Sequence, residues 1–320
     1  MCRGNIHTVR PRTCCEWWLL SCSYIPCVIA MALIMANTFP YHLVFLPVLR
    51  TACEIGNAHI AYYYYCLVVM MLAEALVYSN LFLVIFTCPG FVPHEPWVEA
   101  PVYQGRSVSD NPYEVFELDR LGRLRYCSFC KQFKPDQAHH CHTCRCCVYR
   151  MDHHCPWINN CVGRGNGKFF LLFLSYIPLG AFHIVATTLF SCVFHFPNFF
   201  SREMPDNSLT SIVLLFSMLF SSIMGFCFLV FAAHFLFMAY RGQTSVSRMI
   251  ASKKHPDTLE EVRKRQAEDR TFYMFDLFGS DQRWYRMMLP FKPDHDLRRA
   301  PHGYLRRFGG ATEVAYMSLV

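Results

Sequence analysis

Four long apolar runs constrain this chain more than any other feature of its sequence. They cover about residues 17–39, 61–86, 169–196 and 211–240. A helix needs roughly 20 apolar residues to cross the hydrocarbon core of a bilayer, and each run reaches that length. Because backbone polar groups cannot stay unpaired in lipid, a spanning segment of this kind must be helical. We therefore expect an all-α integral membrane protein with four transmembrane helices.

The overall composition agrees with membrane spans. Apolar residues make up 53% of the chain and charged residues 17%, whereas soluble domains average about 45–50% and about 25%. The enrichment comes from the four blocks and is not spread evenly. The residues after the first apolar run do not look like the small-residue cleavage site of a secretory signal. We therefore expect no cleavable signal peptide.

Basic residues predict the orientation of the spans. Of the 30 Lys and Arg residues, only Arg50 and Arg202 lie in the loops after the first and third spans. Cytosolic segments carry the excess of Lys and Arg in membrane proteins. This predicts a cytosolic tail over 1–16, helices within 17–86, a cytosolic cysteine-rich zinc domain over 87–168, helices within 169–240 and a cytosolic tail over 241–320. The net charge of +7 is mild, and a basic patch held beside lipid fits nucleic-acid binding poorly.

A dense block of cysteine and histidine lies in the predicted insert. Eight of the 18 cysteines fall between Cys127 and Cys161, together with five histidines. In a reducing compartment, C-x-x-C pairs with interleaved histidines are typical of structural zinc. Two tetrahedral ions need eight ligands, which the block supplies with residues left over. Unligated buried cysteines are the alternative, and spacing alone does not say which cysteines are ligands.

Cys155 stands out within the block because of its neighbours. It directly follows Asp152, His153 and His154. A cysteine beside a histidine can exist as the thiolate at neutral pH, and the thiolate is the nucleophile. A nearby carboxylate can orient that imidazole, as in other acid–histidine–nucleophile arrangements. The alternative interpretation is that all of these side chains bind zinc or support its ligands.

The residues around Cys155 resemble a known family. The string Asp-His-His-Cys-Pro-Trp at 152–157, with Asn159, Asn160, Cys161, Val162, Gly163 and Asn166, is similar to the DHHC-type palmitoyltransferases. The motif similarity covers 127–170, and the four-span layout fits over 17–279. The resemblance implies a protein S-acyltransferase that moves a long-chain acyl group, in particular palmitoyl, from acyl-CoA to protein cysteines at the cytosolic face of the membrane.

The resemblance also implies a role for each residue of the block. One zinc ion would be held by Cys127, Cys130, His140 and Cys147, and the other by Cys141, Cys144, His154 and Cys161. Cys155 would carry the acyl group, His153 would be the base and Asp152 its orienting partner. Both zinc ions would be structural, because protein ligands fill all four positions on each.

The co-substrate acyl-CoA carries phosphates, so a basic rim is expected near Cys155. The candidates are Arg145, Arg150, Arg164 and Lys168; the alternative is that they only reflect the basic flank of a membrane protein. The acyl chain would lie among the spans, where the small Gly180 and Ala181 either leave room for a longer chain or serve helix packing. Glu74 in the second span is either a functional acid or a partnered structural group.

Three positions depart from the usual pattern of the family. Cys88 precedes Pro-Gly where aspartate is usual, Ser247 replaces the glutamate of a Thr-Thr-x-Glu motif, and Asp276 stands where an aromatic motif has asparagine. None of the three is among the implied catalytic or metal-binding residues. We expect these departures to affect how the tail packs against the catalytic loop.

Two other functional classes fit part of the sequence. A membrane-anchored zinc module for protein binding explains eight ligands but not Cys155 and its neighbours. An inactive acyltransferase-like scaffold fits the missing glutamate but not the intact DHHC string. For the enzyme, the expected partners are acyl-CoA, membrane lipid and proteins with cytosolic juxtamembrane cysteines, in the endomembrane system or plasma membrane. Cys14 and Cys15 are themselves candidates for acylation.

Overall fold

The computed structural model describes residues 22–103, 111, 113–119, 121–196, 207–251, 259–302 and 304. The candidate acylation sites Cys14 and Cys15 lie outside these residues, as does the predicted tail 1–16. The chain divides into two compact units. One comprises Met1–Ile25, Phe82–Phe170 and Phe235–Val320, and the other comprises Pro26–Leu81 and Leu171–His234.

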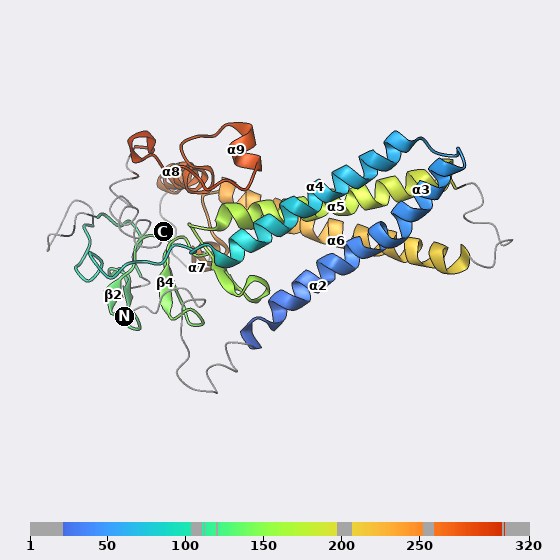
Figure 1. The fold of residues 1–320 in the computed structure, drawn as a ribbon. Helices are drawn as coiled ribbons and strands as arrows, with labels where there is room; N and C mark the ends of the chain where they lie inside the picture. Colours follow the sequence, from blue (N-terminus) through green and yellow to red (C-terminus); the bar gives the residue numbers. More distant parts are fainter. Residues whose placement is uncertain are drawn as a thin grey trace. The chain divides into compact units, whose positions relative to one another are not determined.

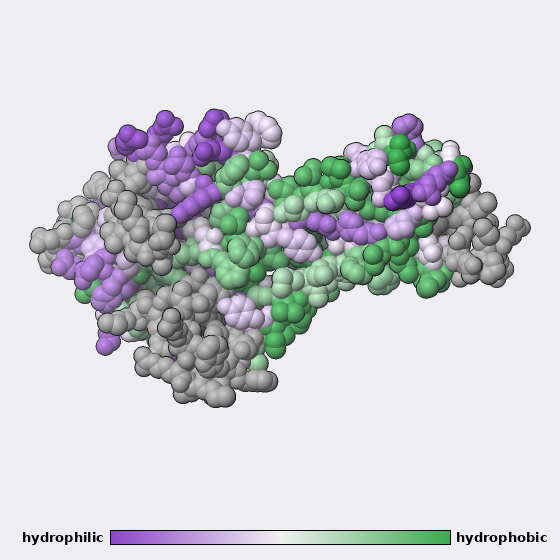
Figure 2. All heavy atoms as spheres, viewed as in Figure 1, coloured by the Kyte–Doolittle hydropathy of each residue, from purple (hydrophilic) through white to green (hydrophobic). Residues whose placement is uncertain are grey.

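Within the described residues, four helices are long and apolar enough to cross a membrane. They are Ile25–Glu54, α4 (Ile60–Phe86), α5 (Gly167–Phe194) and the stretch Leu209–Tyr240 of α6 (Asn207–Tyr240). Figure 1 shows α4, α5 and α6 running alongside one another, and Figure 2 shows hydrophobic residues over the helical surface. Only 22% of the most apolar window of α6 is buried, as expected where side chains face lipid. The prediction of a multi-pass membrane protein with four transmembrane helices is confirmed.

The first of these helices is longer than the sequence predicted. The prediction ended it at residue 39, but it continues as α2 (Ile25–Pro40), η2 (Tyr41–Phe45) and α3 (Leu46–Glu54). Pro40 has no N–H to donate within the helix. The π-helical segment that follows Pro40 widens the helix locally. The helix therefore passes the proline instead of ending there.

In the unit of Pro26–Leu81 and Leu171–His234, small residues let the helices approach one another. A Cβ added to Gly225 of α6 would lie 3.1 Å from the Ala181 Cβ on α5. One added to Gly180 of α5 would lie 3.6 Å from the Ala73 Cβ on α4. Small residues at such crossings are how membrane helices pack without a hydrophobic driving force.

The other unit folds the segment between α4 and α5 into short antiparallel ribbons. They are β1 (Tyr126–Cys127) with β2 (Gln132–Phe133), β3 (His139–Cys141) with β4 (Cys146–Val148), and β5 (His153–Cys155) with β6 (Asn160–Val162). Two-stranded ribbons are marginally stable at best on their own. This segment therefore needs cross-links or a covering layer to hold its shape.

The tail after α6 supplies part of that covering layer. It forms α7 (Ser245–Ala251), α8 (Leu259–Phe278) and α9 (Trp284–Met288). Phe272 and Phe275 of α8 and the later Tyr304 share one buried cluster with Trp97 and Tyr149. Trp97 Nε1 donates a hydrogen bond of 2.8 Å to the Tyr149 hydroxyl within it. The tail is thus part of the core that surrounds the ribbons.

Candidate active site and metal centres

Eight side chains form two groups of potential metal ligands. The groups are Cys127, Cys130, His140 and Cys147, and Cys141, Cys144, His154 and Cys161. Within each group, the ligand atoms all lie within 4.8 Å of one another. The structure therefore brings together the same two sets of four residues that the family resemblance implied.

The spacing of the donor atoms fits zinc. Bonds of about 2.3 Å to sulfur and about 2.0 Å to nitrogen place tetrahedral sulfur and nitrogen ligands about 3.5 Å apart. His154 Nδ1 lies 3.7, 3.5 and 3.6 Å from the Sγ atoms of Cys141, Cys144 and Cys161. In the other group, His140 Nδ1 lies 3.3 Å from Cys130 Sγ. Three thiolates and one imidazole in each group would therefore hold one Zn²⁺ ion.

The pKa values of the clustered thiols also favour a bound metal ion. Burial and the neighbouring Cys130 and Cys127 raise the pKa of Cys147. Hydrogen bonds with Cys141 and Cys144 raise the pKa of Cys161. Thiols this close cannot all ionise by themselves, whereas a bound divalent cation holds each of them as the thiolate.

Strand alternation decides which neighbours in the sequence become ligands. In β3, His140 belongs to the first group and the next residue, Cys141, to the second. In β5, His154 lies opposite its fellow ligand Cys161 across the ribbon. Because successive side chains of a strand point to opposite faces, His153 and Cys155 lie on the face away from this metal site.

Cys155 shares that face with a histidine held by a carboxylate. Cys155 is buried and is not a member of either metal group among the described residues. His153 Nδ1 lies 2.7 Å from Asp152 Oδ2. The His153 side chain is 40% exposed and that of Asp152 only 6%. The imidazole is therefore anchored from the protein side and reachable from outside.

The electrostatics of this trio favour a charged histidine beside the cysteine. Burial alone would raise the pKa of Asp152, but hydrogen bonds from His153 and Ser245 hold it below its ordinary value. Burial also disfavours the imidazolium of His153, yet hydrogen bonds with Asp152 and Cys155 raise its pKa to about 9. An imidazolium beside Cys155 is the environment that stabilises a reactive thiolate.

Ser245, at the start of α7, holds Asp152 from the far side. Its backbone N–H donates to Asp152 Oδ1 at 2.7 Å and its hydroxyl donates to Oδ2 at 3.2 Å. Ser245 was not among the site residues predicted from the sequence. Its place within the stretch that resembles Thr-Thr-x-Glu was the one signal that could have found it.

Ser247, which stands where the motif has glutamate, takes part in the cap at the start of α7. Thr244 N donates to Ser247 Oγ at 2.8 Å, and Ser247 N donates to Thr244 Oγ1 at 3.1 Å. This is the reciprocal pattern of a capping box, in which glutamate or glutamine usually takes the second position. The departure therefore leaves the start of α7, and with it Ser245, capped.

The departure at Cys88 is tolerated because the contacts there use backbone atoms. Gly165 N donates to Pro89 O at 3.0 Å, and Tyr149 N donates to Gly90 O at 2.8 Å. A Cβ added to Gly163 would lie 2.5 Å from Pro89 O, so this close approach requires glycine. The side chain of residue 88 takes no part in these bonds.

Asn160 ties the β5–β6 ribbon to the end of α4. Asn160, opposite Cys155 in the ribbon, donates through Nδ2 to the carbonyls of Val84, Ile85 and Thr87 at 3.2, 3.0 and 3.0 Å. The last carbonyls of a helix have no partner within it. Asn160 satisfies them and fixes the ribbon to α4 at the same time.

Three of the four residues predicted to bind phosphate are buried against protein groups. Arg150 Nε lies 3.0 Å from Asp276 Oδ2, and Arg164 Nε lies 2.9 Å from Oδ1 of the same carboxylate. Lys168 Nζ donates to the carbonyls of Arg286 and Phe291 at 2.5 and 2.7 Å. Charges enclosed in this way are not available to a ligand. We therefore correct the prediction for these three residues, whereas Arg145 is exposed.

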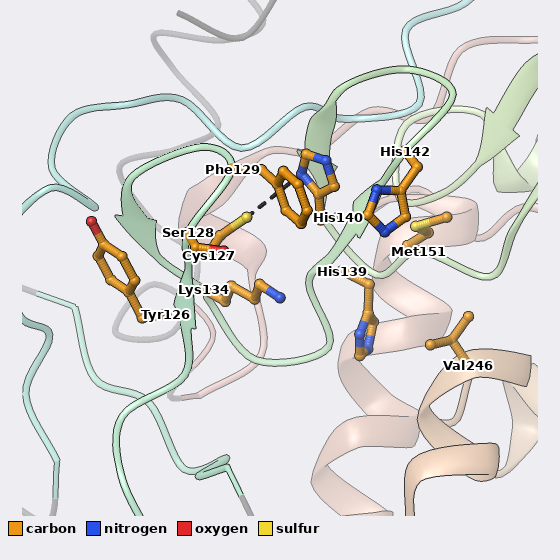
Figure 3. Close-up of a pocket in the computed structure, with 10 residues that line it drawn as sticks. All are labelled: Tyr126, Cys127, Ser128, Phe129, Lys134, His139, His140, His142, Met151 and Val246. Atoms are coloured by element: carbon orange, nitrogen blue, oxygen red, sulfur yellow. Dashed lines mark hydrogen bonds between the residues drawn. The ribbon is translucent and has the colours of Figure 1, made fainter.

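A cavity of about 310 Å³ on the ribbons contains Lys134, a cation that was not among the predicted phosphate ligands. Its lining residues are Tyr126, Cys127, Ser128, Phe129, Lys134, His139, His140, His142, Met151 and Val246. Figure 3 shows Lys134 pointing its amine into the space between Phe129 and His139. None of these described lining residues is acidic. The cavity therefore combines the Lys134 ammonium group and aromatic rings with Cys127 and His140, two ligands of the first metal group.

Two lining residues of this cavity are chain neighbours of the residues around His153. Met151 is the residue before Asp152, and Val246 is the residue after Ser245. Asp152, His153 and Cys155 themselves are not among the described lining residues.

A second cavity lies within the unit that holds most of the membrane helices. Its lining residues are Ile34, Asn37, Thr38, Met70, Ala73, Glu74, Val77, Ile177, Gly180, Ala181 and Met224. Glu74 Oε1 lies 3.0 Å from His42 Nε2, so this intramembrane acid has a partner. Gly180 and Ala181, for which the sequence left open room for an acyl chain or helix packing, both line this cavity and both lie against small residues of neighbouring helices.

The fold and the site together define a class of protein. It is a four-helix membrane protein with two Cys₃His metal groups and, in the same ribbons, an unligated cysteine beside a histidine held by aspartate. A cysteine beside a histidine that is oriented by a carboxylate is an arrangement known from enzymes with a nucleophilic thiol.

Comparison with known proteins names the family. The family model described as DHHC palmitoyltransferase matches residues 121–252. Probable protein S-acyltransferase 14 of Arabidopsis thaliana is 32% identical over 240 residues, which cover 71% of this chain and 72% of the relative. Palmitoyltransferase ZDHHC2 of Rattus norvegicus is 38% identical over 133 residues, covering 39% of this chain and 35% of ZDHHC2. The chain belongs to the DHHC palmitoyltransferase family.

Proposed function

We propose that this protein is a protein S-acyltransferase that carries a long-chain acyl group, in particular palmitoyl, on Cys155. The donor is acyl-CoA, and the acceptors are cysteines of other proteins at the cytosolic face of an endomembrane or of the plasma membrane. One observation supports the proposal most. Cys155 is outside both metal groups and shares a strand face with His153, which Asp152 holds at 2.7 Å.

The reaction has two steps, each of which exchanges one thioester for another. In the first, Cys155 Sγ attacks the carbonyl carbon of acyl-CoA, the bond from that carbon to the CoA sulfur breaks, and CoA leaves with a proton from His153. In the second, His153 takes the proton of the acceptor thiol, the acceptor sulfur attacks the acyl carbon, and Cys155 leaves as the thiolate. The covalent intermediate divides one transfer into two easier displacements.

The residues around Cys155 contribute position and charge. Asp152 keeps the His153 imidazole oriented and stabilises its protonated form. Zinc in the two Cys₃His groups would be structural, because each group already offers four protein ligands. Its task would be to keep β5 and β6 paired, so that Cys155 and His153 stay on one face.

We assign the phosphate-bearing part of CoA to the cavity around Lys134. The cavity offers one ammonium group, aromatic rings for an adenine and no acidic lining residue among those described. Lysine is a common phosphate ligand, and aromatic rings stack readily on bases. The acyl chain would lie among the membrane helices. Each CH₂ that leaves water there contributes about 0.8 kcal/mol.

The Lys134→Ala variant tests the assignment of the CoA headgroup. We expect the KM for palmitoyl-CoA to rise by about five- to tenfold with kcat nearly unchanged. The variant loses a charged hydrogen bond that is equally strong in the enzyme–substrate complex and in the transition state. The control is Lys131→Ala, since Lys131 is exposed on the same ribbon but does not line the cavity. Equal KM values for the two variants would contradict the assignment.

The nucleophile is tested by trapping the acyl-enzyme. Protein in detergent is incubated with radiolabelled palmitoyl-CoA, and the gel is treated with hydroxylamine, which cleaves thioesters. We expect hydroxylamine-sensitive label on the wild type and none on Cys155→Ser. The matched control is Cys146→Ser, because Cys146 is buried in β4 but belongs to neither metal group, and it should keep the label. A folded, zinc-loaded wild type without label would instead favour the membrane-anchored zinc module or an inactive scaffold.

A further inference from the structure

Asp276, near the end of α8, is the centre of a buried charge cluster. Its side chain is 1% exposed, and it forms ion pairs with Arg150 and Arg164 at 3.0 and 2.9 Å. The Tyr304 hydroxyl donates to Asp276 Oδ1 and accepts from Arg164. His295 Nε2 lies 3.1 Å from the backbone carbonyl of Asp276. One carboxylate thus joins two cations with residues of the tail.

The two arginines stand at the two ends of the catalytic ribbon. Arg150 is two residues before Asp152, in the link between β4 and β5, and Arg164 is two residues after the last residue of β6. Their side chains are 2% and 5% exposed. Whatever holds both arginines also holds the start and the end of β5–β6.

Aromatic rings complete the surroundings of these cations. The Arg150 guanidinium lies 4.7 Å from the centre of the Tyr273 ring, and that of Arg164 lies 5.2 Å from the Tyr304 ring. Two guanidinium groups and one carboxylate leave an excess positive charge, which aromatic faces attract. Asp276 is nevertheless the carboxylate paired with both, and removing one partner of a buried ion pair leaves an uncompensated charge.

We propose that Asp276 is a positioning residue, which clamps both ends of the catalytic β5–β6 ribbon from the tail through Arg150 and Arg164. It touches neither acyl group nor CoA. It acts through the ribbon, which must stay paired for Cys155 and His153 to share a face. The effect on catalysis rests on the proposed acyltransferase function, but the effect on the ribbon does not.

The Asp276→Asn variant keeps the shape of the side chain and removes its charge. We expect acyl-enzyme formation to slow by about 10–100-fold, with the KM for acyl-CoA unchanged and zinc still at two ions per chain. Hydrogen exchange is the readout that does not depend on activity. Amides of residues 151–164 should exchange faster, while those of 126–133, in the first ribbon, should not. Unchanged exchange over 151–164 would overturn the proposal.

A second substitution separates the loss of charge balance from the loss of the clamp. Asp276→Asn raises the buried charge by one, and adding Arg164→Gln returns it to the wild-type value without restoring either ion pair. We therefore expect the double variant to stay within about threefold of the rate of Asp276→Asn. Recovery of the wild-type rate would show that the buried charge, and not the clamp, sets the rate, and would overturn the proposal. The control is Asp296→Asn, which removes only surface pairs, with Arg298 and Arg299, and should change neither readout.

If Asp276→Asn fails to fold, Tyr304→Phe decides the matter. It removes only the hydroxyl that bridges Asp276 and Arg164. Exchange over 151–164 should increase, and labelling should slow by a smaller factor of about three to ten. Wild-type exchange over 151–164 in Tyr304→Phe would overturn the clamp. A wild-type protein that does not label at all would refute the proposed function, whereas the exchange data would still judge the clamp.

Discussion

The His154→Ala variant is expected to bind one zinc ion per chain instead of two and to lose acyl-enzyme formation. His154 supplies the only imidazole of its metal group and lies opposite its fellow ligand Cys161 in the ribbon. Apparent zinc-binding free energies of structural sites are about 10–16 kcal/mol, and that energy serves as folding energy. Three residues in each strand cannot keep β5 and β6 paired without it.

Zinc content is measured by mass spectrometry on protein purified in detergent, and labelling is measured on the same preparation. The matched control is His94→Ala, because His94 is exposed in the same unit and belongs to neither metal group. It should retain two zinc ions and full labelling. Two zinc ions in His154→Ala would show that the metal group has been assigned wrongly.

The Asp152→Asn variant is expected to slow acyl-enzyme formation by about 10²–10⁴-fold with zinc retained. Asp152 accepts from His153 Nδ1 at 2.7 Å. An amide loses the negative charge that stabilises the imidazolium, and it can also turn an N–H towards that nitrogen and select the wrong tautomer. Because the carboxylate acts on the reacting groups and not on binding, the KM for acyl-CoA should change little.

Ser245→Ala provides a graded comparison for Asp152→Asn. It removes the hydroxyl bond of 3.2 Å to Asp152 but leaves the backbone N–H bond of 2.7 Å. We expect a loss of only about three- to tenfold in the rate. Both rates are read from single-turnover labelling on a rapid-quench instrument. If Asp152→Asn stays within about fivefold of the wild type, Asp152 is not the orienting partner of His153.

The membrane part of the fold could be predicted because each span is one contiguous stretch. Residues 61–86, 169–196 and 211–240 were predicted, and the helices run over Ile60–Phe86, Gly167–Phe194 and Leu209–Tyr240. Length and apolar character are local properties, so a local pattern reports them. The end of the first span was wrong because continuing a helix past Pro40 depends on the π-helical segment after it.

The metal centres were predictable in number but not in detail. Eight ligands for two ions follow from the composition of the block. Which residue joins which ion depends on ribbon pairing, since Cys141 and its neighbour His140 belong to different groups. Spacing could not decide this, and the assignment was taken from the resemblance to a family.

By itself, the sequence determined the four membrane helices, the cysteine-rich insert and the string Asp152-His153-His154-Cys155. Only the tertiary structure decided that Ser245 holds Asp152 from 93 residues away, and that Asp276 pairs with Arg164 from 112 residues away. It likewise enclosed Arg150 and Arg164, for which the sequence left phosphate binding and a basic membrane flank as alternatives. Spacing and periodicity describe neighbours along the chain, whereas the partner of a buried charge is set by whichever distant segment folds against it.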